Sequence, residues 1–323
     1  LHKAIRRQRQ MCIRDRGRGF NMQKERSKKL WGSIALLICT IIWGSAFVMQ
    51  SKAGEYVSPF YLNALRFFIG GVFLIPFVFI FRDKKEKKTK KGFGQTIFGG
   101  ILVGLALCVA SNLQQAGVVR TTPGKAGFLT AMNIIFVPIL SFLLFRRKIN
   151  WKQIAGIVLA VLGVGLLTMD NSFSINLGDV LCLGCAFAFA VHIMLVDHYS
   201  KKGSAITLSM VSFFACSVFS LCIAVPAENL SPENLKHGLP YILYLGIFSC
   251  GIAYTLQAVG QKRVEELPAT LLLSLESVFS AVFSFILLKE DFDIKEICGC
   301  ILMLTAVIVV QVLKENKNEK SSG

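Results

Sequence analysis

A single carboxylate interrupts the apolar stretch LLLSLESVFSAVFSF at residues 271–285. Glu276 is followed at the i+4 position by Ser280, on the same helical face, and no Lys or Arg lies between Arg263 and Lys289. An ionisable side chain inside hydrocarbon is costly and is therefore a candidate for function. We interpret Glu276 as a proton carrier or a contact for a cationic substrate. The alternative is a protonated carboxyl group that only hydrogen-bonds a neighbouring helix.

Other polar side chains in apolar stretches could contact a substrate. Gln114 and Gln257 carry uncharged amides, which suit a polar metabolite, and hydrogen bonds between helices explain them equally well. Asn133 aligns with Glu276 in an internal repeat described below, so the two would approach the centre from opposite halves. Trp43 could stack on a ring or gate a cavity, although aromatic residues in helices more often serve packing.

Two further ionisable side chains lie in apolar stretches. Arg66 could attract a carboxylate on the substrate, and it could equally extend to the membrane interface on its aliphatic stem or pair with an acidic side chain. His192 could relay protons with Asp197. A spacing of five residues does not align two side chains on one helical face, however, which favours a histidine that only packs.

The elements that must position these side chains are membrane-spanning helices. The chain is 54% hydrophobic and 17% charged, with a mean hydropathy of +0.58, which is outside the range of soluble proteins. Each of ten apolar stretches approaches or exceeds the roughly 20 residues needed to cross a bilayer. The sequence therefore predicts an all-α membrane protein. The ten predicted helices span residues 31–50, 59–81, 95–118, 124–145, 151–168, 178–198, 205–226, 239–261, 267–288 and 294–313.

The chain repeats itself. Residues 113–156 align without a gap over residues 256–299 with thirteen identical positions of 44, which include matched Gln, Arg and Gly residues that apolar composition does not explain. We predict one five-helix repeat at 31–168 and a second at 178–313. Because each repeat contains an odd number of spans, the second must be inverted relative to the first. Inverted repeats are typical of secondary transporters, with the substrate site where the halves meet.

Positive charge is unevenly distributed between alternate loops. From Met22 onward, the termini and loops of one side hold 22 Lys or Arg residues, and those of the other side hold six. Because basic loops stay in the cytoplasm, this asymmetry predicts that both termini, including a tail at 314–323, are cytoplasmic. We expect a multi-pass protein of the bacterial cytoplasmic membrane.

The basic segment at residues 1–21 calls for a separate interpretation. Its MCIRDR sequence resembles the translation of a transposon end used in sequencing libraries, and the chain begins with Leu. We predict that residues 1–21 are a non-native leader and that the native start is Met22. If the segment is not native, its positive charge is no evidence for a nucleic-acid-binding arm. We therefore expect no nucleic-acid partner.

The ten cysteines indicate neither disulfides nor a metal site. Nine of them fall inside predicted helices, and the pair Cys182 and Cys185 has no second Cys pair or His cluster nearby at the spacing of a metal site. We interpret them as small packing residues and expect no metal and no cofactor. A stripe of small residues at Gly156, Ala160 and Gly163 indicates close helix packing and suggests a homodimer face.

Several quoted motifs, taken together, resemble the EamA-type transporters of the drug/metabolite transporter superfamily. The resemblance implies ten helices around a central cavity lined by helices 1–4 and 6–9, with helices 5 and 10 peripheral, and movement of small metabolites, often outward. The sequence departs from the family pattern at Arg146–Arg147 and at Ser277. These departures weaken any inference of this chain's substrate from the substrate of one subfamily. The motifs are IIWGSAFVMQSKAGEYVSPFYLNALRFFIGG (41–71), NIIFVPILSFLLF (133–145), IAGIVLAVLGVGLL (154–167) and LSLESVFSAVFSFILLKE (273–290).

The predicted function is that of a secondary transporter rather than an enzyme. We expect a permease that exports a small polar or aromatic metabolite by alternating access, coupled to protons, as a homodimer through helices 5 and 10. A membrane-embedded enzyme remains an alternative, although no HExxH sequence or paired-carboxylate motif is present. A passive channel or a lipid flippase is a further alternative, which net flux against a gradient would separate from a coupled carrier.

Overall fold

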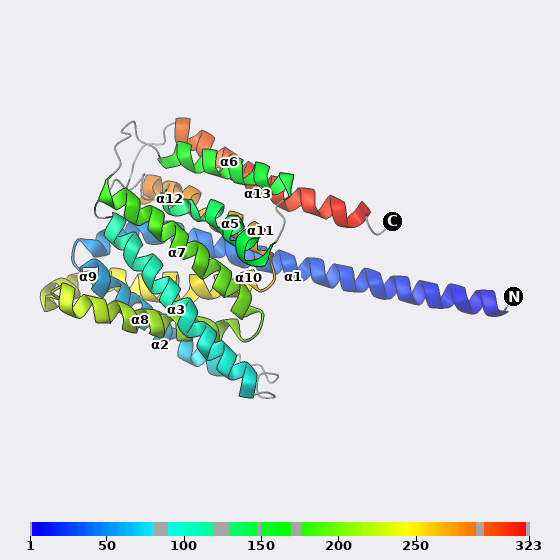
Figure 1. Ribbon diagram of the computed structural model, residues 1–323, viewed down its shortest axis with the longest axis horizontal. Helices are drawn as coiled ribbons and strands as arrows, with labels where there is room; N and C mark the ends of the chain where they lie inside the picture. Colours follow the sequence, from blue (N-terminus) through cyan, green and yellow to red (C-terminus); the bar gives the residue numbers. More distant parts are fainter. Residues whose placement is uncertain are drawn as a thin grey trace.

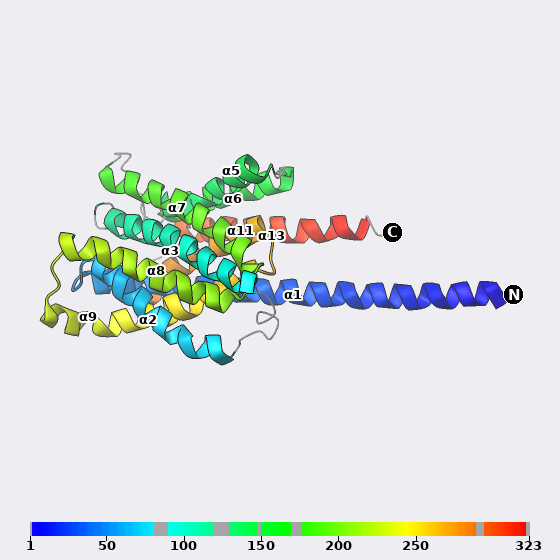
Figure 2. The same ribbon diagram turned by 60° about the horizontal axis from the view of Figure 1, so that its bottom comes forward.

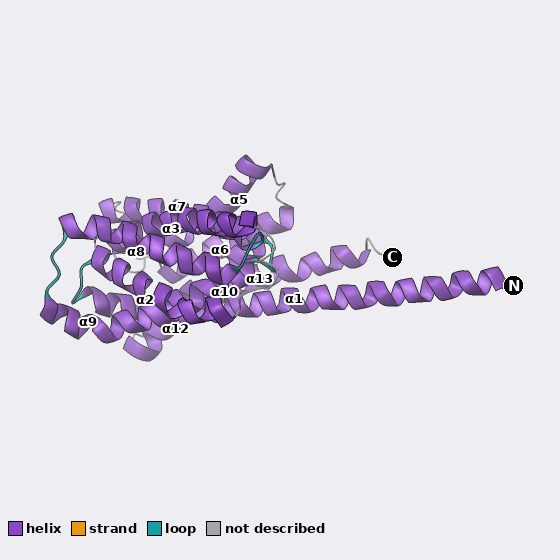
Figure 3. Cartoon of the chain, turned by 90° about the horizontal axis from the view of Figure 1, so that it is seen from below, coloured by secondary structure: helices purple, strands orange, loops and turns teal. Residues whose placement is uncertain are grey.

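The computed structural model describes residues 2–80, 90–118, 120, 129–146, 150–168, 176–288 and 294–320. Within these ranges every regular element is a helix, as Figure 3 shows. Seven helices are long and apolar enough to cross a membrane, and three shorter apolar helices lie at Leu129–Leu144, Ile154–Leu166 and Ile297–Val309. These ten segments coincide with the ten predicted ones, so the prediction of an all-α membrane protein of about ten helices is confirmed. Residues 124–128, predicted to begin the fourth helix, lie outside the described residues.

In their order along the chain, the helices divide between its two halves. The first half contains α1 (His2–Gly54), α2 (Pro59–Ile80), α3 (Lys90–Val118), α5 (Asn133–Phe145) and α6 (Trp151–Thr168). The second half contains α7 (Leu177–Ser200), α8 (Ala205–Ala227), α9 (Pro232–Tyr244), η2 (Leu245–Tyr254), α10 (Thr255–Gln261), α11 (Glu266–Leu273), α12 (Glu276–Phe283), η3 (Ser284–Leu288) and α13 (Ile294–Lys320).

Two predicted helices of the second half are not regular α-helices. The segment predicted at 239–261 begins earlier, at Pro232, and contains the π-helix η2 between α9 and α10. The segment predicted at 267–288 is interrupted between α11 and α12. Hydropathy detects both crossings because residues 239–261 and 267–288 are predominantly apolar, but it does not distinguish an α-helix from a π-helix or from a helix with a break.

Local sequence signals account for the starts of α7 and α8. The Asn176 side chain accepts a hydrogen bond from the Asp179 backbone N–H, and the Asp179 carboxylate accepts one from the Asn176 N–H. This reciprocal pair is a capping box, which satisfies amides that have no partner inside the helix. The Ser204 hydroxyl accepts a hydrogen bond from the Thr207 N–H at the start of α8 in the same way.

The two halves of the chain interlock rather than stand side by side. Helix α2 of the first half packs along α8 of the second half, and α3 packs along both α7 and α8. Helix α1 contacts α12, η2 and α10. Figure 1 shows α3, α7 and α8 as neighbours that cross the bundle together. The interior between the halves is therefore built from both, which is where the predicted site residues are expected.

Helices α6 and α13 form a peripheral pair, as expected for helices 5 and 10. They lie together at one edge of the bundle in Figure 1 and contact each other extensively. A Cβ atom at Gly163 would lie 2.9 Å from the backbone oxygen of Gly299 and from Cγ of Met303. The small side chains of α6 at this level therefore allow close approach of α13 within one chain.

Both termini leave the bundle at the same end. Figure 2 shows the first part of α1 and the last part of α13 projecting from this end in the same direction. An even number of crossings requires this arrangement. The assignment of this end to the cytoplasm stays a prediction from the charge of the loops.

Candidate functional site

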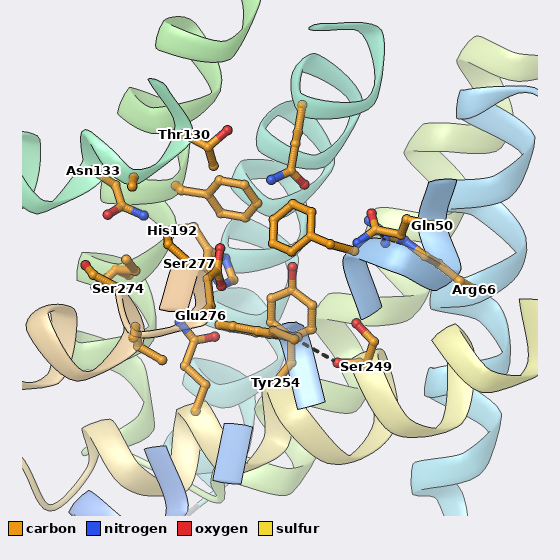
Figure 4. Close-up of a pocket in the computed structure, with 18 residues that line it drawn as sticks. Gln50, Arg66, Thr130, Asn133, His192, Ser249, Tyr254, Ser274, Glu276 and Ser277 are labelled. Atoms are coloured by element: carbon orange, nitrogen blue, oxygen red, sulfur yellow. Dashed lines mark hydrogen bonds between the residues drawn. The ribbon is translucent and has the colours of Figure 1, made fainter. Parts of the chain in front are cut away.

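A cavity of about 60 Å³ lies between the two halves of the bundle. Figure 4 shows its wall, with side chains converging from helices of both halves. All seven side chains that the sequence singled out line this cavity, although they come from seven different segments of the chain. They are Glu276, Asn133, Gln114, Gln257, Trp43, Arg66 and His192.

Glu276 enters the cavity at a break in the membrane-spanning helix. Helix α11 ends at Leu273, a turn follows at Ser274, and α12 begins at Glu276. Both the backbone N–H and the hydroxyl of Ser274 donate to the Thr270 carbonyl oxygen, at 3.0 and 2.9 Å. The turn is bridged by hydrogen bonds from the N–H groups of Ser277 and Phe279 to the carbonyl oxygens of Ser274 and Leu275, so the segment continues past Glu276.

The first half contains a break at the equivalent position. A turn at Met132 precedes α5, which begins at Asn133, and the N–H of Met132 donates to the carbonyl oxygen of Leu129 at 3.2 Å. Asn133 is the residue that the internal repeat aligns with Glu276. Each half therefore presents a polar side chain to the cavity directly after a short turn within a membrane-spanning segment.

Glu276 has no hydrogen-bond or ion-pair partner among the residues that the structure describes. Helix α1 approaches α12 so closely at this level that a Cβ atom at Gly44 would lie 2.5 Å from Cβ of Phe279. Glu276 is half-buried and lines the cavity beside Ser277 and Ser274 (Figure 4). The expected alternative, a carboxyl group that hydrogen-bonds a neighbouring helix, has no counterpart in the described contacts.

His192 is buried, and its ring meets the rings of Phe189 and Tyr254 edge-on. Its Nδ1 lies 3.4 Å from the carbonyl oxygen of Val103, and the side chain of Gln257 also interacts with the imidazole. The carboxylate of Asp197 instead pairs with Lys201, one helical turn further along α7. The structure therefore does not join His192 and Asp197 into a relay, as their spacing indicated.

Trp43 connects α1 to the π-helix of the second half. Its indole N–H donates to the Ser249 carbonyl oxygen at 3.2 Å, and its ring meets the Tyr254 ring edge-on at a centroid distance of 4.6 Å. Ser249 and Tyr254 both belong to η2. π-Helical turns are frequent at functional sites, and here the wider turn faces the cavity.

Arg66 turns into the protein instead of extending to the membrane interface. Its side chain is only 3% exposed, and its Nη1 donates to Oε1 of Gln50 at 2.8 Å. The same oxygen accepts a hydrogen bond from Nε2 of Gln115 at 2.6 Å. Sequence reasoning missed Gln50, because it lies at the very end of a predicted helix, where a polar residue is ordinary.

A second polar cluster lies in the contact between α2, α3 and α8. Nδ2 of Asn63 donates to Oδ1 of Asn112 at 2.9 Å, and Nδ2 of Asn112 donates to the Ser220 hydroxyl at 2.9 Å. All three side chains are buried. Since Ser220 belongs to the second half, this cluster joins the two halves by hydrogen bonds.

Asn112→Ala is expected to lower the free energy of unfolding by about 1 to 2 kcal/mol, because it removes two hydrogen bonds between membrane helices. Thermal unfolding of the purified protein in detergent measures the loss. Ser220→Ala is the matched control, since it removes the contacts of α8 with Asn112 and Cys108, keeps the bond between Asn63 and Asn112, and should cost less. Equal losses in the two variants would contradict the central position of Asn112 in the cluster.

The fold and its cavity define a class of protein, a membrane transporter with many spans. A solved crystal structure that is 17% identical aligns with a TM-score of 0.73 over 88% of this chain and 98% of the other, which shows that the fold is shared. The EamA-like transporter family matches residues 30–169 and again residues 176–312. The chain belongs to the EamA-like transporter family.

Curated relatives cover most of the chain. An uncharacterized transporter of Archaeoglobus fulgidus is 31% identical over 88% of this chain and 87% of its own length. The uncharacterized transporter YetK of Bacillus subtilis is 25% identical over 89% of each protein. A chloroplastic WAT1-related protein of Arabidopsis thaliana is 25% identical over 85% of this chain and 68% of its own length. These relatives support the assignment to a transporter and carry no substrate in their names.

Proposed function

We propose that the protein is a secondary transporter that exports a small polar or aromatic metabolite across the bacterial cytoplasmic membrane. The observation that carries this proposal is the convergence of seven polar or aromatic side chains from both halves on one cavity. Substrate sites of inverted-repeat transporters lie at this place, between the halves. Movement of one half against the other would open the same cavity to either side in turn.

Proton coupling at Glu276 is the second part of the proposal. A titratable side chain that lines a cavity and has no partner among the described residues can bind a proton in one state and release it in the other. His192, a second titratable side chain, lines the same cavity. A cationic substrate would compete for the same carboxylate, which would couple its exit to proton entry.

Comparison of the medium around bacterial cells tests export. Cells that produce the full chain should accumulate outside them at least one compound that cells with an empty vector do not. The compound then serves as the substrate in direct transport assays with purified protein in vesicles. Identical media from the two strains, with the protein present in the membrane, would contradict export of any metabolite that the host makes.

A homodimer through α6 and α13 is a further part of the proposal. Since the small side chains at Gly163 are already covered by α13, two copies would have to meet through the outer faces of this pair. Those faces expose large apolar side chains, among them Val158, Leu162, Ile301 and Leu304. Mass measurement of the protein in lipid nanodiscs should give twice the mass of one chain, and a single-chain mass would contradict the dimer.

A further inference from the structure

Arg66 is a buried cation without an acidic partner in the described part of the chain. Its side chain is 3% exposed, and Nε has no hydrogen-bond partner there. The guanidinium contacts the neutral amide of Gln50 and lies over the face of the Phe67 ring, 5.0 Å from its centroid. A buried charge is costly unless a group of opposite charge compensates it. The transported substrate can supply that group, because Arg66 lines the cavity.

The surroundings of Gln50 show where such a group would bind. Oε1 of Gln50 accepts hydrogen bonds from Nη1 of Arg66 and Nε2 of Gln115, so donors from α2 and α3 point at one oxygen atom from α1. A carboxylate oxygen at this position would keep both hydrogen bonds and add opposite charge. Its second oxygen could accept from Nη2 of Arg66, which together with Nη1 gives the end-on bidentate geometry that guanidinium groups favour.

We propose that Arg66 binds the carboxylate of the substrate and that the Gln50 amide is the internal group which this carboxylate displaces. The proposal rests on the proposed transport function and narrows its substrate to a class, small organic carboxylates. Gln115 is a positioning residue, which orients whichever oxygen occupies the place.

The rest of the cavity restricts the substrate further. Among the described residues that line the cavity, Arg66 is the only Lys or Arg, so this part of the wall provides for one anionic group rather than a phosphate chain. In Figure 4 the Tyr254 ring lies between the Gln50–Arg66 pair and Glu276. A substrate with an apolar body could therefore lie along the ring, with its carboxylate at one end.

Two kinds of substrate share this chemistry. A plain monocarboxylate would use Arg66 alone, whereas a zwitterionic amino acid would also place its ammonium group toward Glu276. Both bind through the carboxylate, so both are consistent with the proposal. Compounds that differ only in the amine separate them.

Ligand-induced thermal stabilisation of the purified full chain tests carboxylate binding without any transport step. The probes are propionate, 3-phenylpropionate, alanine and phenylalanine, each beside its primary amide. The acids should raise the unfolding temperature and the amides should not. Arg66→Gln should weaken binding of the acids roughly 10- to 100-fold, which is the effect of losing hydrogen bonds to a charged group. Glu233→Gln, an exposed change on α9, is the control and should bind as the wild type does.

Gln50→Glu is a second test variant, and it is expected to stabilise the protein rather than destabilise it. It places a tethered carboxylate in the proposed position, with nearly the same shape as the native side chain. This variant should unfold at a higher temperature than the wild type in the absence of acids, because Arg66 gains a charged partner, and it should no longer respond to them.

The outcomes that would overturn the carboxylate site differ from the outcome that would overturn the transport function. The carboxylate site is wrong if acids and amides stabilise equally, if Arg66→Gln keeps the response to acids, or if no acid stabilises the wild type at 10 mM. If acids bind through Arg66 but no solute crosses vesicles that contain the protein, the transport function fails and the carboxylate site stands. A third result assigns the site to zwitterions. In this case amino acids raise the unfolding temperature of the wild type, the plain acids do not, and Glu276→Gln reduces the effect of the amino acids.

Discussion

Replacing Glu276 by Gln is expected to abolish proton-driven accumulation of the substrate. The amide keeps the size of the side chain and can still form hydrogen bonds. Unlike a carboxyl group, however, it neither binds nor releases a proton in the neutral pH range. Since Glu276 lines the cavity and has no ion-pair partner among the described residues, the change breaks no internal contact. The variant should therefore fold normally and bind a carboxylate through Arg66, yet fail to move it against a gradient.

Vesicles with an imposed pH difference measure this effect. For exchange of one proton per substrate, each pH unit supports about a tenfold concentration ratio across the membrane. The wild type should approach that ratio, and Glu276→Gln should not exceed equal concentrations on the two sides. Glu233→Gln is the control for loss of a carboxylate elsewhere. Accumulation by Glu276→Gln at the wild-type ratio would show that another group carries the proton.

Gly44→Val is expected to abolish transport through a packing effect. A Cβ atom at this position would lie 2.5 Å from Cβ of Phe279, 2.7 Å from its backbone carbonyl carbon and 2.8 Å from the backbone N of Ser280. Because two of these neighbours are backbone atoms, no side-chain rotation relieves the clash. Helix α1 would have to move away from α12, which opens the wall that holds Glu276.

The expected loss of unfolding free energy for Gly44→Val is about 1 to 3 kcal/mol, as for other overpacked cores. Thermal unfolding in detergent gives this value, and the vesicle assay gives the loss of transport. Gly184→Ala is the matched control, since the nearest atom to a Cβ there is 3.8 Å away and Ala favours a helix over Gly. Wild-type stability and transport in Gly44→Val would mean that α1 and α12 are not in backbone contact in the membrane.

The sequence was sufficient for the helices and for much of the cavity wall. Apolar length locates a crossing whatever its detailed geometry, so all ten segments were predicted. Glu276, Arg66 and His192 stand out because an ionisable side chain in hydrocarbon must face a cavity or a partner. The internal repeat then paired Asn133 with Glu276, and the structure places both on one cavity, each directly after a short turn in its helix.

The details that orient those side chains could not be predicted. The break before Glu276 follows a run of leucines that is equally compatible with an unbroken helix, and nothing in the apolar segment 245–254 distinguishes a π-helix from an α-helix. The partner of Arg66 depends on which way Gln50 turns at the end of a helical segment. These features arise from contacts between helices distant in sequence, such as Trp43 with Ser249.

The interlocking of the two halves has a consequence for biosynthesis. Helix α3 ends at Val118, but its partner α8 is complete only at Ala227, 109 residues later. At about 5 to 20 residues per second, the ribosome needs roughly 5 to 20 s to make that difference. During this interval Asn112 lies in the bilayer without Ser220. The nascent first half therefore has to be sheltered by lipid, the insertion machinery or provisional helix pairs until the second half arrives.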